Sequence, residues 1–339
     1  MPELRKDYVT DTWVIFAPAR SQRPGLGSNE RRLTDRDACP FCEGHEHMTP
    51  PETYAVRSRG RPNAPGWLVR CVPNKFPALE PTGDVARTAD TLYDRVSGVG
   101  THEVIVETPK HDGNLAFLEH DQLVHIILAY RDRYLELSRD PRYRYVLIFK
   151  NHGERAGATL SHPHSQLIAM PIVPQRIQEE LEAVRRHRRA NSGACVFCRV
   201  VDTELRERRR VVIENPAFVA ISPFAARFPF ETWILPKDHV EAFDGLDDAG
   251  SSSLAEILRD VLARLYHVLN DPDLNYYIHT APAGSRQEGY HWHIEITPRL
   301  AEIAGFERGT GMFINQVMPE DAAAILRGDI RVDGSNQTA

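Results

Sequence analysis

The sequence has no long apolar run, no excess of positive charge and only five cysteines. No apolar run approaches the ~20 residues that a helix needs to cross a bilayer, so no membrane partner is expected. Residues 1–7 lack the apolar core of a signal peptide. The formal net charge of −6 gives no general attraction for nucleic acid or for an anionic membrane. These absences favour a cytoplasmic protein and argue against a nucleic-acid partner.

The cysteines stand as two pairs and one single residue. Cys39 and Cys42 form one Cys-x-x-Cys pair, Cys195 and Cys198 form a second, and Cys71 stands alone. Because disulfides are rare in the cytoplasm, such pairs indicate metal or redox chemistry. The first pair superficially resembles a redox motif, but it follows a polar, Arg-rich stretch instead of a strand, which favours metal. We interpret Cys71 as a buried thiol.

Apolar spacing in the first half of the chain predicts several strands and one helix. The strands are expected at residues 11–18, 67–72, 101–108 and 145–149. The helix is expected at about 120–138, where apolar residues recur at helical spacing.

The second half repeats this order. Segment 231–239 corresponds to segment 103–111, and each begins with Glu and ends with His. A helix is expected near 252–269, begun by a capping box of Ser253 and Glu256, followed by a strand at 275–279.

Each half also closes on a His-x-His pair, His162-Pro-His164 in the first and His291-Trp-His293 in the second. The single His of each segment lies 51 residues before the pair in the first half and 52 in the second. These agreements predict a duplicated α+β unit.

The domain boundaries follow from a charged stretch in the middle of the chain. Residues 172–194 are interpreted as a helical bridge with a solvated face. A chain of 339 residues suggests roughly two domains. We therefore expect one domain over residues 1–175, a second over 176–328 and a disordered tail over 329–339.

Each half supplies two Cys, one single His and one His of the pair, which is a ligand set for metal. Four N/S ligands suit a closed, structural, tetrahedral zinc site. We assign one zinc to Cys39, Cys42, His111 and His162. We assign a second zinc to Cys195, Cys198, His239 and His291. The alternative is a second half that holds its metal through other ligands or holds none.

The stretch from Asn151 to Pro171 carries the candidate nucleophile. In an extended segment, residues two apart share a face, so His162 and His164 project side by side and Pro163 stiffens the pair. With His162 bound to zinc, His164 remains available, and a neutral imidazole nitrogen is a competent nucleophile. The glycines at positions 153 and 157 are expected to turn backbone N–H groups inward to cradle a phosphate.

At this point the sequence resembles the galactose-1-phosphate uridylyltransferase family of the histidine-triad superfamily. The shared motif is Asn151-x-Gly153-x₃-Gly157-x₄-His162-Pro-His164-x-Gln166. The similarity runs from Trp13-x₄-Pro18-x-Arg20-x₂-Arg23-Pro24 to Gly305-Phe-Glu307. Ser165 and the paired Cys-x-x-Cys motifs are also similar to the plant ADP-glucose phosphorylase branch. The resemblance implies an α+β fold of two tandem HIT-like domains, each an antiparallel sheet with packed helices.

The family resemblance implies ping-pong nucleotidyl transfer from a nucleoside-diphosphate sugar to a hexose 1-phosphate. His164 would attack the α-phosphorus and form a nucleotidyl-His intermediate. Gln166 can hydrogen-bond a phosphoryl oxygen but cannot shuttle a proton to water, which favours transfer over hydrolysis. The resemblance also implies a homodimer and a substrate-binding set formed by Arg20, Arg23, Asn74, Asn151, Gly157, Thr159, Glu307 and Gln316.

Within that set the implied roles differ. The nucleotide and phosphate pocket would be lined by Asn74, Asn151, Gly157 and Thr159. The phosphates would also be bound by Arg20 and Arg23. The hexose would be contacted by Glu307 and Gln316.

Two other readings of the sequence stay open. One is a phosphorylase of ADP-glucose with inorganic phosphate as acceptor, or a hydrolase or phosphorylase of dinucleotides, of which Gln166 argues against the hydrolase. The other is a non-catalytic, zinc-stabilised nucleotide-binding protein, which would bind without covalent labelling of His164. Nothing in the sequence distinguishes uracil from adenine, or galactose from glucose.

Overall fold

The computed structural model describes residues 2–6, 13–16, 35–89, 92–284 and 288–330. Arg20 and Arg23 lie outside the described residues, as does the tail from 331 onward. Within the described residues, no helix has both the length and the apolar character of a membrane span.

The described residues form one large antiparallel sheet with the strand order β10-β11-β12-β14-β13-β8-β9-β7-β4-β3. The strands of the first half are β3 (Tyr54–Arg57), β4 (Trp67–Pro73), β7 (Thr101–Val106), β8 (Tyr145–His152) and β9 (His164–Met170). Those of the second half are β10 (Val211–Glu214), β11 (Phe218–Ile221), β12 (Thr232–Pro236), β13 (Leu274–His279) and β14 (His293–Pro298). The two halves meet where β8 pairs with β13, and Asn151 lies opposite Asn275 there.

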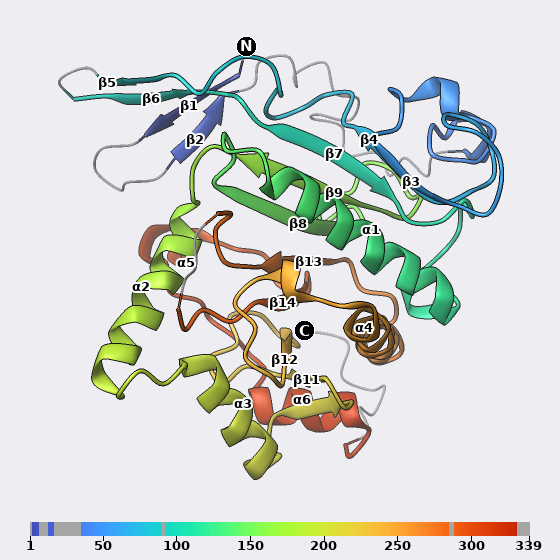
Figure 1. The fold of residues 1–339 in the computed structure, drawn as a ribbon. Helices are drawn as coiled ribbons and strands as arrows, with labels where there is room; N and C mark the ends of the chain where they lie inside the picture. Colours follow the sequence, from blue (N-terminus) through green and yellow to red (C-terminus); the bar gives the residue numbers. More distant parts are fainter. Residues whose placement is uncertain (1, 7–12, 17–34, 90–91, 285–287, 331–339) are drawn as a thin grey trace.

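The second half repeats the first in mirrored order across the β8–β13 pair. Helix α1 (His120–Ser138) connects β7 to β8, and α4 (Asp248–Leu269) connects β12 to β13. The two helices pack against each other and cover the same face of the sheet (Figure 1). Their buried side chains, which include Ile127, Tyr130 and Leu258, join the main apolar core. The predicted α+β class with antiparallel sheets and packed helices is confirmed.

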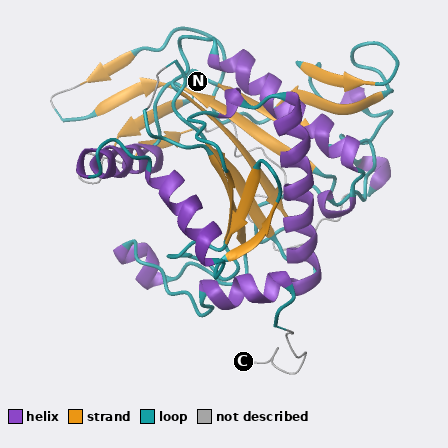
Figure 2. Cartoon of the chain, turned by 60° about the horizontal axis from the view of Figure 1, so that its bottom comes forward, coloured by secondary structure: helices purple, strands orange, loops and turns teal. Residues whose placement is uncertain are grey.

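The opposite face is covered differently in the two halves. In the second half, α2 (Gln175–Ala190) and α3 (Val196–Glu207) pack on it through Leu181 and Val201. Figure 2 shows the strands running between these two sets of helices. In the first half this face carries the Cys39–Cys42 loop, which packs against Val104 and Val106.

The remaining elements lie at the periphery of the large sheet. A second sheet of the described residues has the order β2-β1-β6-β5, with β1 (Glu3–Lys6), β2 (Trp13–Phe16), β5 (Arg87–Ala89) and β6 (Asp94–Ser97). The C-terminal part holds α5 (Gly305–Thr310) and α6 (Pro319–Arg327). Short 3₁₀ turns lie at Arg36–Ala38, Glu46–Met48, Leu115–Phe117 and Phe243–Gly245.

One helix start differs from the prediction. Helix α4 begins at Asp248, and Asp247 is its N-cap, with a carboxylate that accepts a hydrogen bond from the Gly250 N–H. Ser253 and Glu256 therefore lie inside the helix, and the predicted capping box is wrong. An Asp cap satisfies the first orphan N–H groups as well as Ser does, so the helix extends toward it.

Candidate active site and metal centres

His164 is the first residue of β9 and follows Pro163 directly. Its Nδ1–H donates to the backbone oxygen of His162 at 2.7 Å, which leaves the lone pair of the imidazole on Nε2. The ring is 8% exposed and lies with its centroid 5.3 Å from that of Phe41. A ring oriented by a carbonyl, with its second nitrogen unprotonated, has the form that nucleophilic attack requires.

The first predicted metal set converges in the structure. Cys39, Cys42, His111 and His162 are all buried, and their ligand atoms lie within 4.8 Å of one another. The Sγ of Cys42 is 3.2 Å from Nδ1 of His111, and the Sγ of Cys39 is 3.6 Å from Nδ1 of His162. Nε2–H of His162 donates to the backbone oxygen of Thr108 at 2.8 Å, so Nδ1 is unprotonated and faces the sulfur atoms. This donor set and this tautomer fit a tetrahedral metal ion.

The charge of this Cys₂His₂ group depends on which of its four side chains carry protons. Burial, with Cys39 next in effect, raises the pKa of the Cys42 thiol to about 11. Burial also lowers the pKa of His162 to about 4. Without a cation the thiol is therefore protonated and the imidazole is neutral, and a divalent ion would displace the thiol proton.

The second predicted set also converges, but nearer the surface. Cys195, Cys198, His239 and His291 place their ligand atoms within 4.8 Å of one another. The Sγ of Cys198 is 3.4 Å from Nδ1 of His239 and 3.7 Å from Nδ1 of His291. Nε2–H of His291 donates to the backbone oxygen of Pro236 at 3.0 Å, which repeats the tautomer of the first group. His239 is exposed, and both cysteines are partly exposed.

Gln166 lies two residues beyond His164, on the same face of β9. Its Oε1 is 3.0 Å from Nε2 of His102 on β7, and Nδ2 of Asn74 is 3.2 Å from the same nitrogen. The structure therefore brings Asn74 and Gln166 together around His102. Sequence reasoning did not single out His102, which belongs to an alternating strand and to no motif.

The loop after β8 carries the two glycines for which the sequence predicts a phosphate cradle. Gly153 and Gly157 both have positive φ, and a Cβ at Gly153 would come 2.0 Å from Oδ1 of Asp273. The N–H of Gly157 donates to Glu154, that of Ala158 to Gly153, and that of Arg155 to Asp273. These three N–H groups are hydrogen-bonded within the protein, and a phosphate cradle in this loop stays a prediction.

Asn151 and Thr159 flank this loop. The Oδ1 of Asn151 accepts a hydrogen bond of 2.8 Å from Nδ2 of Asn275, so its own amide nitrogen lies toward Gly157. Asn275 also donates to the backbone oxygen of Ala156 at 2.9 Å. Thr159 is exposed at the end of the loop. The second half of the chain thus holds the loop of the first.

Glu307 and Gln316 lie in the C-terminal segment. Glu307 is in the first turn of α5 and accepts a hydrogen bond from the Ala304 N–H, and Gln316 is exposed. Among the described residues, no hydrogen bond or ion pair links either one to His164. Their segment also exposes Met312, at 64%, and Ile314, at 62%.

A buried polar network lies directly behind His164, on the helix-covered face. Lys150 pairs with Glu107 and donates to the backbone oxygen of His164 at 3.1 Å. The Tyr130 hydroxyl lies 2.7 Å from Glu107 and 2.7 Å from the hydroxyl of Tyr276 on β13. Sequence reasoning missed this network because its members are far apart in the chain and follow no spacing rule.

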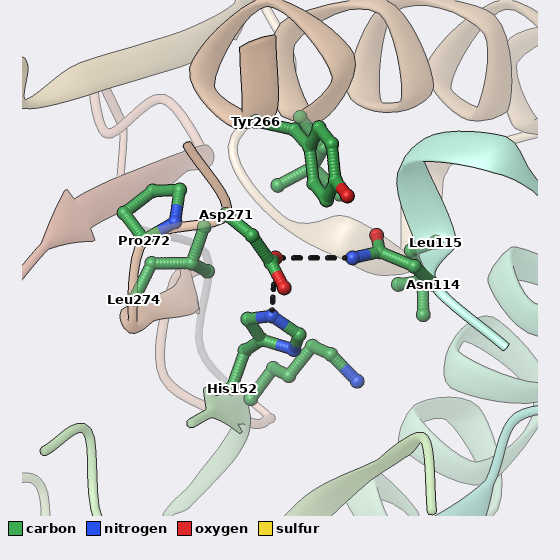
Figure 3. A pocket seen from close by; sticks show the side chains of 9 residues that line it. Asn114, Leu115, His152, Tyr266, Asp271, Pro272 and Leu274 are labelled. Carbon is green, nitrogen blue, oxygen red and sulfur yellow. Dashed lines mark hydrogen bonds and ion pairs between the residues drawn. The ribbon is translucent and has the colours of Figure 1, made fainter. Parts of the chain in front are cut away.

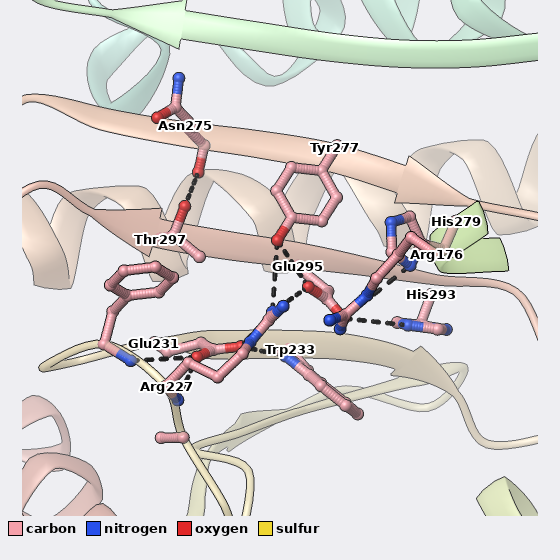
Figure 4. A network of polar contacts seen from close by, with 12 residues as sticks. Arg176, Arg227, Glu231, Trp233, Asn275, Tyr277, His279, His293, Glu295 and Thr297 are labelled. Carbon is pink, nitrogen blue, oxygen red and sulfur yellow. Dashed lines mark hydrogen bonds and ion pairs between the residues drawn. The ribbon is translucent and has the colours of Figure 1, made fainter. Parts of the chain in front are cut away.

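A third group of possible ligands occupies the second half. The ligand atoms of Glu180, His279, His293 and Glu295 lie within 4.8 Å of one another. Figure 4 shows Arg227 reaching Glu231 and Glu295, with the Tyr277 hydroxyl directed at Glu295. Although burial opposes the shift, His279 at 3.0 Å lowers the pKa of Glu180 to about 2.

His293 is the counterpart of His164 in this half. Its Nδ1–H donates to the backbone oxygen of His291 at 3.1 Å, as in the first half. Its Nε2, however, faces Oε1 of Glu295 at 3.6 Å, and the ring is 1% exposed. Because a buried carboxylate occupies the position in front of the ring, the first half holds the candidate nucleophile.

A pocket on the helix-covered side is formed jointly by both halves. Asp271 accepts hydrogen bonds from Asn114 at 3.3 Å and from His152 at 3.1 Å, and Tyr266 lies beside them (Figure 3). His152 and Asn151 are neighbours on β8 and therefore point to opposite faces of the sheet. This pocket is thus separated by the sheet from the His164 face.

An antiparallel α+β fold that presents a His-x-His pair at a strand end is consistent with a class of nucleotidyltransferases. Residues 1–174 match the family described as galactose-1-phosphate uridyl transferase, N-terminal domain. By this match the chain belongs to the galactose-1-phosphate uridylyltransferase family. Residues 103–331 also match a domain of unknown function, DUF4921.

Similar proteins span nearly the whole chain. ADP-glucose phosphorylase of Arabidopsis thaliana is 37% identical over 96% of this chain and 92% of its own length. Galactose-1-phosphate uridylyltransferase of Thermotoga maritima is 31% identical over 96% of this chain and 98% of its own.

The solved structures agree with these relatives. That of the Arabidopsis ADP-glucose phosphorylase with bound ADP-glucose has a TM-score of 0.76 at 35% identity, and covers 98% of this chain and 100% of the other. A uridylyltransferase structure has a TM-score of 0.80 at 30% identity, and covers 96% of this chain and 98% of the other.

Proposed function

We propose that the protein is a hexose-1-phosphate nucleotidylyltransferase that works by ping-pong transfer through His164. Nε2 of His164 attacks the α-phosphorus of a nucleoside-diphosphate sugar. A nitrogen–phosphorus bond forms, the bond from the α-phosphorus to the bridging oxygen breaks, and hexose 1-phosphate leaves. A phosphate oxygen of the second substrate then attacks the same phosphorus and restores the free imidazole.

The observation that carries this proposal is the hydrogen bond from His164 Nδ1–H to the backbone oxygen of His162. It holds the lone pair on Nε2 before attack. It also supports the positive charge that the ring acquires once Nε2 bonds to phosphorus.

The two candidate substrate pairs share this first half-reaction. In the uridylyltransferase type, UDP-glucose donates and galactose 1-phosphate accepts. In the phosphorylase type, ADP-glucose donates and inorganic phosphate accepts, and the 37% identity to the Arabidopsis enzyme supports this second candidate. A phosphorylase of dinucleotides would differ in its donor. Gln166 argues against a hydrolase because an amide does not activate water.

The nucleotide site is proposed on the sheet face that carries His164, beside the loop after β8. The nucleotide and its phosphates would be contacted by Asn74, Asn151, Gly157 and Thr159. The guanidinium groups of Arg20 and Arg23 would pair with the phosphates. Glu307 and Gln316 would contact the hexose. Glu307 and Gln316 lie in a segment with exposed apolar side chains, which is typical of an interface between proteins. We therefore propose a homodimer in which these two residues of one copy reach the nucleotide site of the other.

Zinc is proposed for both Cys₂His₂ groups. Four protein ligands complete a tetrahedral ion, which would stabilise the Cys-x-x-Cys loop and the strand end that carries the His-x-His pair. The ion would hold His162, and with it the carbonyl oxygen that orients His164.

The test is covalent labelling in the absence of an acceptor. The protein is incubated with UDP-glucose, UDP-galactose or ADP-glucose, quenched in base, and mapped by mass spectrometry. We expect a nucleotidyl adduct on His164 from one nucleotide. Addition of galactose 1-phosphate or inorganic phosphate should then discharge the adduct and identify the acceptor. Binding without an adduct would leave the non-catalytic reading, and rapid release of free nucleotide without an acceptor would indicate a hydrolase.

A further inference from the structure

His102 lies on the same face of the sheet as the candidate catalytic residues. In the β7–β9 register it is opposite Ile168, while Gln166 is opposite Val104. His102 and Gln166 are therefore diagonal neighbours, a spacing that long polar side chains can bridge. His102 is 4% exposed and Gln166 is 7% exposed, so any hydrogen bond between them is shielded from water.

The hydrogen bonds around His102 determine where its proton resides. The backbone N–H of Ala78 donates to Nδ1 of His102 at 3.0 Å, so Nδ1 is the acceptor. A neutral imidazole then carries its proton on Nε2, which lies 3.0 Å from Oε1 of Gln166. The network thus assigns both the tautomer of His102 and the orientation of the Gln166 amide.

Asn74 does not compete with this assignment. Its Nδ2 is 3.2 Å from Nε2 of His102, but its Oδ1 accepts from the Phe76 N–H at 2.9 Å, which fixes Nδ2 as the atom near the ring. The NH₂ group of Asn74 and the Nε2–H of His102 are both donors, so they form no hydrogen bond with each other. The Ala78 N–H is fixed by the backbone and keeps Nδ1 of His102 as an acceptor. The proton of the neutral ring therefore stays on Nε2.

We propose that His102 is a positioning residue that directs the NH₂ group of Gln166 toward the phosphoryl group on His164. A glutamine amide can rotate by half a turn, and the reversed amide would present an oxygen to the phosphoryl oxygens and repel them. His102 removes this alternative by holding Oε1 of Gln166. The amide is then oriented before substrate binds, which is the preorganisation that makes such donors effective.

This inference rests on the proposed function, and two matched variants test it. His102→Phe keeps a buried ring but removes the Nε2–H donor. His102→Gln keeps a donor near the position of Nε2. Both are compared with Gln166→Ala and with the double variant His102→Phe/Gln166→Ala. Melting temperature and metal content of each variant verify that the fold and the metal groups are intact.

The first readout is the rate of His164 labelling in a single turnover. Loss of an oriented donor to developing charge costs about a hundredfold, so we expect that loss for Gln166→Ala. For His102→Phe we expect a roughly tenfold loss, since an unanchored amide is correctly oriented only part of the time. The nucleotide-sugar concentration for half-maximal rate should stay unchanged. His102→Gln should restore most of the rate, and the double variant should match Gln166→Ala within about twofold.

The second readout does not depend on turnover. With ¹⁵N-labelled histidine and glutamine side chains, NMR reports the tautomer of His102 and the shift of the Gln166 amide. We expect an Nε2–H tautomer and an amide signal that moves in His102→Phe but not in His102→Gln. An Nδ1–H tautomer would overturn the inference even if no nucleotide labels the protein. The inference would also be overturned if His102→Phe were labelled at the parent rate. The same holds if His102→Phe slowed labelling of the Gln166→Ala variant as much as it slows labelling of the parent. If the parent protein shows the Nε2–H tautomer of His102 but no nucleotidyl adduct forms on His164, the proposed function is refuted instead.

Discussion

Substitution of the two histidines of the His-Pro-His segment should separate folding from chemistry. In His164→Ala the protein loses one hydrogen bond to a backbone oxygen and a contact with Phe41, which costs about 1–2 kcal/mol. In His162→Ala it loses a buried metal ligand and the hydrogen bond to Thr108. A structural zinc site contributes on the order of 10 kcal/mol, so removal of one of four ligands should cost several kcal/mol.

These costs translate into distinct melting temperatures. At roughly 2–4 °C per kcal/mol, His164→Ala should melt within a few degrees of the parent and His162→Ala ten degrees or more below it. His164→Ala should retain the parent metal content while labelling falls by at least about 10⁴-fold, because the nucleophile is absent. Differential scanning fluorimetry, metal analysis by mass spectrometry and the labelling assay measure the three quantities. If both variants melt alike, far below the parent and with equal metal loss, the division between ligand and nucleophile is wrong.

The other predictions concern metal, a buried ion pair and pH. Metal analysis of the pure protein should find close to two zinc ions per chain. A value near three would place metal in the Glu180 group as well, and no zinc would refute both sites. Cys39→Ser should lower the melting temperature more than Cys195→Ser, since the first group is buried and the second partly exposed; an equal effect would contradict this reasoning. Lys150→Met should cost about 3–5 kcal/mol in urea unfolding because it leaves Glu107 buried without its ion-pair partner, and Lys150→Met/Glu107→Gln should recover part of it. The pKa of Glu180 is lowered to about 2, below the ~4.3 of an unfolded Glu, so its contribution is complete above that value and is lost as pH falls toward 2. Glu180→Gln should therefore show a shallower loss of stability between pH 5 and pH 2, and an unchanged pH profile would count against the shift.

Local patterns predicted the parts of the site that lie within short motifs. The two Cys-x-x-Cys pairs and the His-x-His pairs recur at matched intervals, and each set of four residues converges as the pattern indicated. Alternating and helical spacing likewise located β7, α1 and β8. The domain boundaries and the substrate contacts remain predictions.

The errors and omissions have physical reasons. In the loop after β8, the hydrogen bond of the Arg155 N–H depends on Asp273, which lies more than a hundred residues away in the chain. His102 acts through a strand pairing that local spacing does not reveal. Helix α4 begins at Asp248 because Asp247, several residues before Ser253, already supplies an N-cap to the Gly250 N–H.

The β8–β13 pairing makes the molecule resemble a dimer fused into one chain. If the halves were produced separately, each would expose a bare strand edge, and a bare edge recruits another strand. Two copies of the N-terminal half could then pair through β8. Such a pair would carry two copies of His164 but no Asn275 or Asp273 to hold the loop beside each of them. In the single chain, the second half therefore supplies the side chains that hold the loop of the half that carries His164.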